Sequence, residues 1–344
     1  MTLARELIRL EYSVEFLLMQ AQGELREQLP CGVKIINLNA PRTRNLFGGL
    51  AAYLREREPD VVIANMWPLT VAAIIVKLLA GVRTRFVVVE HAPLSIQYSH
   101  RGLIHWLALR ASIHLFFPLA DKRISVSSGV ADDISALGRI SRSSINVIHN
   151  PLCLQNEKHS ADAAAERVWR GWKGPRLITV GRLKKEKNHP LLIRAFKRLL
   201  AEQDARLLIL GTGELAAATS AVAKAEGVAD KVFMPGAALD PTPFYRSADL
   251  FVLSSDYEGF GNVIVEALDS GLPVVSTNCG SGAAEILKEG RYGLLTPVGD
   301  ADELAMAMTE ALAKTWDQEQ LKQRASDFAP EKITKKYIEV IFTN

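Results

Sequence analysis

Short apolar runs and segments of helical periodicity alternate along almost the whole chain. The run Phe86-Val87-Val88-Val89 lacks polar alternation, which is typical of strands covered on both faces. Strands separated by helices predict parallel βαβ units and doubly wound sheets. In the first half we expect strands at 13–19, 33–38, 60–64, 84–90, 123–127 and 146–149, and helices at 2–10, 46–57, 69–80, 101–117 and from 129.

The same alternation of strands and helices begins again at Pro175, after a polar stretch. Here we expect strands at 176–180, 206–210, 231–234, 249–253 and 273–277, and helices at 189–202, 214–226, 243–247, 262–270, 283–288, 301–313, 317–326 and 331–342. A chain of 344 residues is long for one hydrophobic core. The sequence therefore predicts a first domain at 1–151, a linker at 152–174, a second domain at 175–328 and a C-terminal helix at 329–344.

One glycine-rich segment lies between two predicted strands of the second half: Glu258-Gly259-Phe260-Gly261-Asn262-Val263-Ile264-Val265-Glu266-Ala267-Leu268. A glycine-rich loop that opens a helix presents backbone N–H groups outward, so the amides of Gly259 to Val263 predict an anion site. Glu266 comes four residues after Asn262 and therefore shares its helix face, while Glu258 lies in the loop.

The two carboxylates need a different ligand, because negative side chains beside an anion site are unfavourable unless they bind something else. Sugar hydroxyls are candidates, since an ionised carboxylate accepts several hydrogen bonds. A nucleotide sugar carries hydroxyls on both sides of its phosphates. The alternative is a surface loop and a helix whose glutamates face solvent.

A cluster of cations follows the first predicted strand of the second half, at the carboxyl edge where open α/β sheets bind ligands. Its members are Arg182, Lys184, Lys185 and Lys187. By itself such a run also fits a solvated loop.

These motifs together resemble a known family. Glu-x7-Glu followed by Ala-Leu, with Gly-Phe-Gly after the first Glu, resembles the signature of the retaining glycosyltransferase family 4. That family has the GT-B fold, an α/β architecture of two Rossmann-like parallel-sheet domains that face a cleft. The resemblance covers nearly all of the chain and is most specific from Val180 to Leu287.

The resemblance implies a role for each matched residue. Arg182 and Lys187, in the arrangement Gly-Arg-Leu-x3-Lys, would grip the donor diphosphate together with the amides of Gly259, Phe260, Gly261, Asn262 and Val263. Glu266 would take the ribose hydroxyls. Fixed cations and a helix N-terminus can stabilise a departing diphosphate without a metal ion, so we expect no metal and no cofactor besides the donor.

His91 ends the predicted strand at 84–90, again at a carboxyl edge. A lone histidine is more often structural than catalytic. The position of His91, directly after Glu90, nevertheless resembles that of the family's active-site histidine, which contacts the transferred sugar. The resemblance therefore implies that Glu258 and His91 hold the hexose, and that the last helix crosses back to the first domain.

Three further motifs have plain structural interpretations beside the functional one. Gly211-Thr212-Gly213 fits a turn that needs glycine, although in the family this loop is near the nucleotide. The segment 278–287 resembles a donor-lining element, or is a helix start with Glu285 in solvent. Asp300-Ala301-Asp302 predicts the cap of a helix rather than a metal site.

The charge of the chain limits the classes of partner that we expect. The net charge of +3 is too small to argue for nucleic acid as a partner. The positive charge is nevertheless concentrated in residues 1–150, which favours an anionic membrane surface or a phosphorylated acceptor.

Cys31, Cys153 and Cys279 are too few and too far apart for a disulfide framework or a zinc cluster, so we expect the protein to lie in a reducing cytoplasm. The apolar segment 101–117 fits an interfacial helix or a helix packed on the sheet.

The start of the chain differs from the family pattern. Met1 leads directly into the amphipathic helix at 2–10, and nothing there resembles a signal peptide. Family members begin with a strand and a Gly-Gly loop before this helix. The comparison predicts that the first strand of the N-terminal sheet is missing.

The resemblance implies transfer of a hexose or N-acetylhexosamine from a nucleoside-diphosphate sugar, with UDP expected, to a sugar or lipid-linked saccharide, with retention at the anomeric carbon. Polysaccharide or glycolipid biosynthesis is the expected setting, with peripheral contact at the inner membrane face as a hypothesis. Two alternatives stay open: a nucleotide-sugar epimerase of the same fold, and a protein that binds the donor but is inactive.

Overall fold

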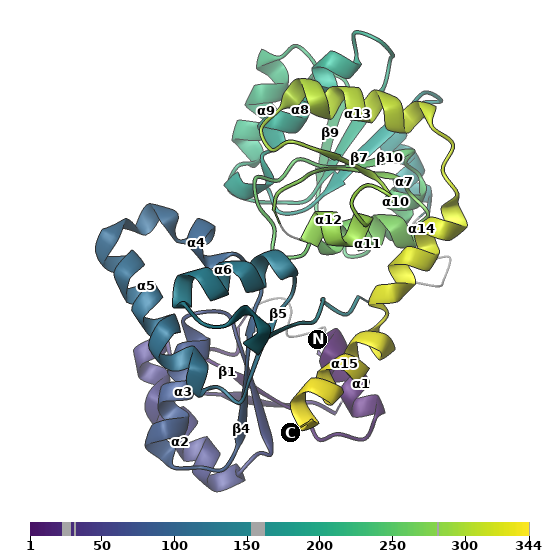
Figure 1. The fold of residues 1–344 in the computed structure, drawn as a ribbon. Coiled ribbons are helices and arrows are strands. Elements are labelled where there is room, and N and C mark those ends of the chain that lie inside the picture. The colour runs from purple at the N-terminus through teal and green to yellow at the C-terminus, as the bar shows by residue number, and fades with distance from the viewer. Residues whose placement is uncertain (23–28, 31, 153–161, 281, 344) are drawn as a thin grey trace. The chain divides into compact units, whose positions relative to one another are not determined.

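The chain folds into two units, which are described separately (Figure 1). The computed structural model describes residues 1–22, 29–30, 32–152, 162–280 and 282–343. The first unit comprises Met1–Pro151 and Pro330–Asn344, and the second comprises Leu152–Ala329.

All strand pairs of the first unit are parallel. Its strands are β1 (Glu15–Leu18), β2 (Lys34–Asn37), β3 (Val61–Asn65), β4 (Arg85–Glu90), β5 (Lys122–Ser125) and β6 (Ile145–Val147). Its helices are α1 (Thr2–Arg9), α2 (Leu46–Arg57), α3 (Leu69–Ala80), α4 (Leu94–Gln97), α5 (Gly102–Phe116), α6 (Ser128–Gly138) and α15 (Pro330–Phe342), with short 3-10 turns at Thr43–Asn45, Ser99–Arg101, Phe117–Leu119 and Arg142–Ser144. Strands β3, β4, β5 and β6 form one sheet in that order, and β1 pairs with β2 in a separate two-stranded sheet.

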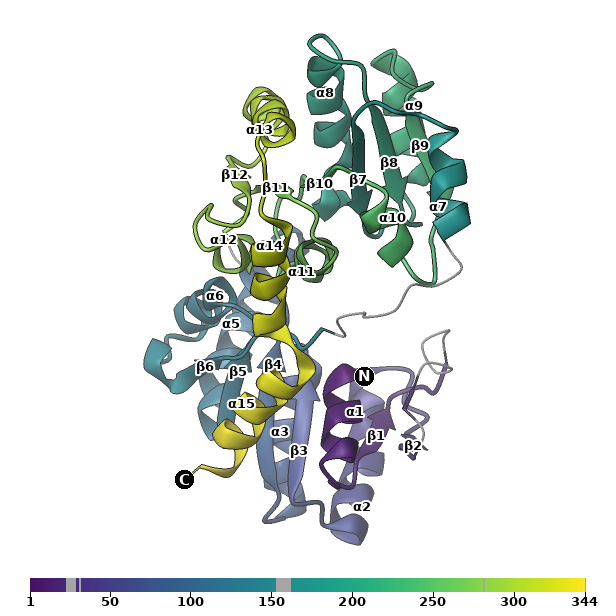
Figure 2. The same ribbon diagram turned by 90° about the vertical axis from the view of Figure 1, so that its right-hand side faces the viewer.

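The C-terminal helix α15 belongs to the first unit and covers one face of its larger sheet. Side chains alternate between the faces of a strand, so Val87 and Val89 of β4 face α15, where they pack with Ile333, Tyr337 and Ile341. Phe86 points to the other face, among residues of α2 and α3. Helices α15 and α1 lie side by side (Figure 2).

The second unit is a doubly wound parallel sheet. Its strands are β7 (Arg176–Val180), β8 (Arg206–Leu210), β9 (Val232–Gly236), β10 (Leu250–Leu253), β11 (Val274–Thr277) and β12 (Leu294–Thr296). Their order is β9-β8-β7-β10-β11-β12, so the direction of winding reverses between β7 and β10. In open α/β sheets ligands bind outside the carboxyl ends of the strands at such a reversal.

Helices cover both faces of this sheet. They are α7 (Asp162–Trp169), α8 (His189–Leu199), α9 (Ala216–Ala225), α10 (Thr242–Arg246), α11 (Asn262–Asp269), α12 (Gly282–Leu287), α13 (Ala301–Ala313) and α14 (Gln318–Ala325), with 3-10 turns at Lys185–Lys187 and Ser326–Phe328. Helices α8 and α13 pack over the face that presents Leu177, Ile209 and Val252. Figure 1 shows α11 and α12 on the other face.

The prediction of an α/β chain with parallel sheets is confirmed, and the predicted elements agree with the observed ones to within a few residues at their ends. The predicted linker at 152–174 is wrong for residues 162–169, which form α7. Its sequence is rich in alanine, a strong helix former, and buried Trp169 fixes it by donating its indole N–H to the Ser247 hydroxyl at 2.8 Å. Residues 153–161 lie outside the described part of the chain.

Candidate functional site

Two loops of the second unit meet at the reversal of strand order. One follows β7 and runs from Gly181 to Asn188; the other follows β10 and leads into α11. The Asp256 amide donates to the Glu186 carbonyl at 2.8 Å, and the Ser254 hydroxyl donates to the Lys187 carbonyl at 2.9 Å. These contacts tie the two loops together directly above the strand ends.

An ion pair joins the same two loops through side chains. The Lys187 ammonium lies 2.6 Å from Glu258 Oε1, which also accepts a hydrogen bond from the Ser255 hydroxyl at 2.6 Å. The side chains keep only 18% and 13% of their surface exposed. The structure therefore brings together the cation and the first carboxylate that the sequence placed 71 residues apart.

The second carboxylate, Glu266, projects from α11 toward the same region. The hydroxyl of buried Tyr245 donates to Glu266 Oε2 at 2.9 Å. Burial raises the pKa of Glu266, against the opposing effects of the Tyr245 hydrogen bond and of the Lys187 charge. Glu266 thus lies within the electrostatic field of Lys187, as Glu258 does.

The start of α11 is shaped by glycine. Gly261 has φ +97°, a left-handed conformation that favours glycine, directly before the helix begins at Asn262 and Val263. Phe260 is buried against the ring of Phe328, and a Cβ at Gly282 would lie 2.0 Å from the Phe260 carbonyl oxygen. Glycine at 282 therefore lets α12 approach the Gly259-to-Val263 segment closely.

The four cations of the β7 loop differ in exposure and in partners. Arg182 is exposed, and its guanidinium makes no hydrogen bond or ion pair with the residues that the structure describes. Lys185 is exposed and Lys184 is half-buried. Arg182 is thus available to a ligand, while Lys187 is held by Glu258.

The remaining glycine motif is required by the backbone. A Cβ at Gly211 would lie 1.9 Å from the Gly181 carbonyl oxygen, and one at Gly213 would lie 2.4 Å from the Leu183 carbonyl oxygen. The interpretation of this motif as a turn that needs glycine therefore has a direct steric cause. It also keeps the loop after β8 pressed against the one after β7.

The prediction that Asp300 caps a helix is confirmed. Its carboxylate accepts hydrogen bonds from the amides of Asp302 and Glu303, both at 3.0 Å, and Asp302 pairs with Arg198. Among the described residues no group of three His, Cys, Asp or Glu side chains could hold a metal ion. Glu285 lies half-buried on α12, where Arg324 binds its backbone carbonyl.

His91 belongs to the first unit, directly after β4. Its Nε2 lies 3.0 Å from the Asn65 amide oxygen, and burial lowers the pKa of the ring. A neutral imidazole that donates from Nε2 to this oxygen has an unprotonated Nδ1, which can accept a hydrogen bond from a hydroxyl. Because the residue belongs to the other unit, its joint action with Glu258 stays a prediction.

Sequence reasoning missed two residues that bond the carboxylates of Glu258 and Glu266, namely Ser255 in the loop after β10 and Tyr245 on α10. Ser255 bonds Glu258, and its own carbonyl accepts the Thr277 hydroxyl at 2.6 Å; Tyr245 bonds Glu266. A serine and a tyrosine outside a motif give no signal in a single sequence. Their function arises only because folding puts them beside the two carboxylates.

Glu90, next to His91, is an unusual buried acid. It accepts hydrogen bonds from the Trp67 amide at 3.1 Å and the Thr70 hydroxyl at 2.9 Å. Burial raises its pKa to about 7, against the effect of these two hydrogen bonds. The carboxyl group is therefore protonated in the fold over a pH range in which an unfolded chain has lost that proton.

We expect this group to make the first unit less stable as the pH rises from about 4.5 to about 7. The folded state binds the proton more tightly, so the stabilisation is complete at low pH and is lost as the pH passes the folded pKa. The loss should be on the order of 3 kcal/mol. Urea unfolding at several pH values should show a flatter profile for Glu90→Gln, whereas Glu310→Gln, an exposed change on α13, should keep the wild-type slope. Equal slopes for Glu90→Gln and wild type would contradict the assignment.

We expect Tyr245→Phe to lower the free energy of unfolding by about 1–3 kcal/mol, because the mostly buried Glu266 carboxylate loses its hydrogen bond. Tyr53→Phe is the matched control, since Tyr53 donates to Glu15 at 2.8 Å in a more exposed setting and should cost less. A double-mutant cycle with Glu266→Gln measures the coupling. Additive effects would mean that the hydrogen bond does not hold the carboxylate.

Comparison with known proteins gives consistent matches over both units. Residues 1–151 match a family model described as glycosyl transferase 4-like domain, and residues 174–314 match one described as glycosyl transferases group 1. The chain is 31% identical over 262 residues to N-acetylgalactosamine-N,N'-diacetylbacillosaminyl-diphospho-undecaprenol 4-alpha-N-acetylgalactosaminyltransferase of Campylobacter jejuni, covering 74% of this chain and 69% of that protein.

Two solved structures share the fold. The apo form of the lipopolysaccharide outer core galactosyltransferase WaaB is 20% identical, with a TM-score of 0.72 over 95% of this chain and 89% of that one. Anabaena HepE in complex with UDP-glucose is 23% identical, with a TM-score of 0.78 over 94% of this chain and 90% of that one.

Proposed function

The chain belongs to the group 1 glycosyltransferases of GT-B fold, and we propose on that basis that it transfers a hexose or N-acetylhexosamine from a UDP-linked donor to a saccharide or lipid-linked saccharide, with retention at the anomeric carbon. As a member of this family it is a glycosyltransferase, and its relatives include proteins named for lipopolysaccharide core biosynthesis and for amylovoran biosynthesis. The donor, the acceptor and the stereochemistry belong to the proposal.

Relatives support the choice of donor and acceptor. The C. jejuni relative is named for transfer of N-acetylgalactosamine to a diphospho-undecaprenol-linked sugar. The similar fold of HepE holds UDP-glucose. A UDP-sugar and a lipid-linked saccharide are therefore the substrates to test first.

The observation that carries the proposal is the Lys187–Glu258 pair beside Glu266 at the reversal of the second sheet. We assign the donor diphosphate to Lys187, Arg182 and the start of α11, residues 259–263. Glu266 takes the ribose hydroxyls. Glu258 and His91 hold the hexose.

The charges of this arrangement fit departure of a nucleoside diphosphate. Negative charge grows on the diphosphate as the glycosidic bond breaks, and preformed cations stabilise it without rearrangement. When the diphosphate binds Lys187, the ammonium can stay close to Glu258, whose second oxygen then accepts a sugar hydroxyl. We nominate no covalent nucleophile, so acceptor attack on the face from which the diphosphate leaves is the form of retention that we propose.

We expect Lys187→Met to lower kcat by about 100-fold or more, because the cation on the leaving group is lost. Lys185→Met, two residues earlier in the same loop and exposed, should have little effect. Thermal unfolding without donor shows whether each variant is folded. A folded Lys187→Met enzyme with wild-type turnover would refute the assigned role.

A panel of nucleotide sugars tests the function itself. Binding should raise the melting temperature with UDP-sugars more than with GDP- or ADP-sugars. With a lipid-linked acceptor extract, we expect transferred sugar with an α-linkage from an α-linked donor, read by NMR of the product. Conversion of the sugar nucleotide without an acceptor would indicate an epimerase, and stabilisation without turnover an inactive donor-binding protein. Either result overturns the proposal.

A further inference from the structure

The outer face of helix α5 is apolar and exposed. Leu103, Ile104, Leu107 and Leu115 have 71%, 87%, 56% and 59% of their surface exposed. At about 3.6 residues per turn they fall on one side of the helix, together with exposed Ala108 and Ala111. The result is an aliphatic strip bordered by exposed His114, which we call the α5 strip: Leu103, Ile104, Leu107, Ala108, Ala111 and Leu115.

The opposite face of α5 is fixed to the first unit, so the helix cannot turn the strip inward. Leu109, Ile113 and Phe117 are fully buried on that face. The Trp67 indole N–H donates to the Ser112 hydroxyl at 3.0 Å, and the His114 ring lies 2.7 Å from the Gly138 carbonyl oxygen. The strip is therefore permanently turned outward.

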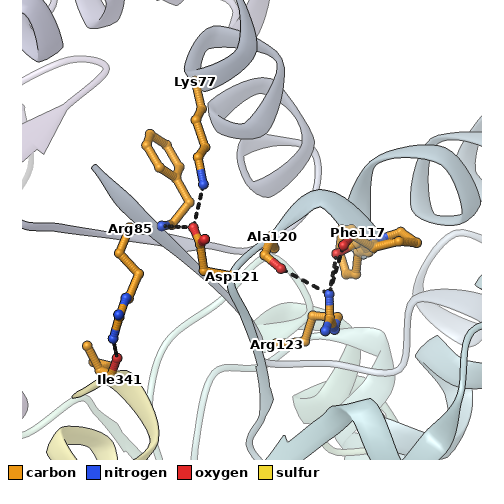
Figure 3. Close-up of polar contacts among 9 residues, drawn as sticks. Lys77, Arg85, Phe117, Ala120, Asp121, Arg123 and Ile341 are labelled. Atoms are coloured by element: carbon orange, nitrogen blue, oxygen red, sulfur yellow. Dashed lines mark hydrogen bonds and ion pairs between the residues drawn. The ribbon is translucent and has the colours of Figure 1, made fainter. Parts of the chain in front are cut away.

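A second anchor holds the end of the segment. Arg123 on β5 donates to the carbonyls of Phe117, Pro118 and Ala120, at 2.9, 3.2 and 3.0 Å (Figure 3). Next to it, Asp121 accepts hydrogen bonds from the Lys77 ammonium at 2.5 Å and from the Phe86 amide at 2.6 Å. The end of α5 is thus tied to β5 of the four-stranded sheet.

These anchors decide how the helix can meet a bilayer. In the part of the chain that the structure describes, the segment Ser99–Leu119 is the one helical stretch long and apolar enough to cross a membrane, and only 17% of its most apolar 18-residue window is buried. A spanning helix would have to leave the sheet to which Arg123 and the buried face tie it. An amphipathic helix with one apolar side instead lies in the plane of the interface.

Charge favours an anionic surface. Residues 91–120 contain no Asp or Glu, whereas Arg101 and Arg110 lie in the same stretch. Arg101 is exposed at the N-terminal end of α5, and half-buried Arg110 lies at the margin of the strip. Cations at the level of lipid head groups are attracted to anionic lipids.

We propose that the α5 strip is a docking surface for an anionic lipid bilayer, with its aliphatic side chains inserted at the boundary between head groups and acyl chains. The strip lacks the aromatic and hydrogen-bonding anchors that protein interfaces concentrate at their centre, and a lipid surface requires none. This attachment is a property of the first unit, additional to the proposed sugar transfer.

Vesicle sedimentation tests the proposal without any enzyme assay. The full chain should bind vesicles of phosphatidylglycerol mixed with phosphatidylcholine at low salt, and should bind more weakly at high salt or to phosphatidylcholine alone. Ile104→Asn with Leu107→Asn should weaken binding on the order of tenfold or more. The matched control, Leu239→Asn with Met306→Asn, removes exposed apolar side chains of the second unit and should leave binding unchanged.

A gain-of-function variant guards against misfolding as an explanation. Ala108→Leu adds apolar surface to the α5 strip and should strengthen vesicle binding severalfold. Absence of binding at low salt, equal losses in both double variants, or equal binding to neutral vesicles would overturn the proposal. So would concentration-dependent dimers that Ile104→Asn with Leu107→Asn abolishes, because the strip would then bind a second copy of the chain.

Discussion

The contact between the loops after β7 and β10 is the constraint on which the second unit's site depends. Parallel strands that wind away from each other leave their first loops adjacent. Here the loops are joined by the Asp256 amide on the Glu186 carbonyl, by the Ser254 hydroxyl on the Lys187 carbonyl, and by the Lys187–Glu258 pair. Glu266 and the start of α11 follow from the same arrangement, because α11 begins at the end of the β10 loop.

A mostly buried ion pair is poor evidence of a stabilising role, since the loss of hydration offsets much of the attraction between the charges. In the proposed function the Lys187–Glu258 pair is a preformed part of the donor site. On that proposal, each partner holds the other in place until a ligand with phosphate and hydroxyl groups binds. Ser255 and Tyr245 hold the two carboxylates in the same way, by donating one hydrogen bond to each.

The first unit combines a rigid sheet with an outward apolar helix. Helix α15 closes one face of the sheet through Ile333, Tyr337 and Ile341. On α5, the residues toward the core are buried while the α5 strip is left without cover by the described residues. An exposed apolar face on a helix that is fixed to the core suits the proposed attachment to a bilayer, because binding there does not alter the packing of the buried face of α5.

The sequence by itself determined the order of strands and helices, the parallel architecture and the identity of the glutamate and cation motifs, because hydrophobic period and glycine position are local properties. It also indicated the cap at Asp300, which depends on residues three positions apart. It failed at α7, because the polar composition of residues 152–174 obscured a helix whose last residue, buried Trp169, is held by Ser247, 78 residues further along the chain. Only the tertiary structure decided that Lys187 meets Glu258, that Tyr245 holds Glu266, and which side of α5 is exposed. Those facts depend on contacts between residues far apart in the chain, and side-chain chemistry alone does not specify which of them folding will bring together.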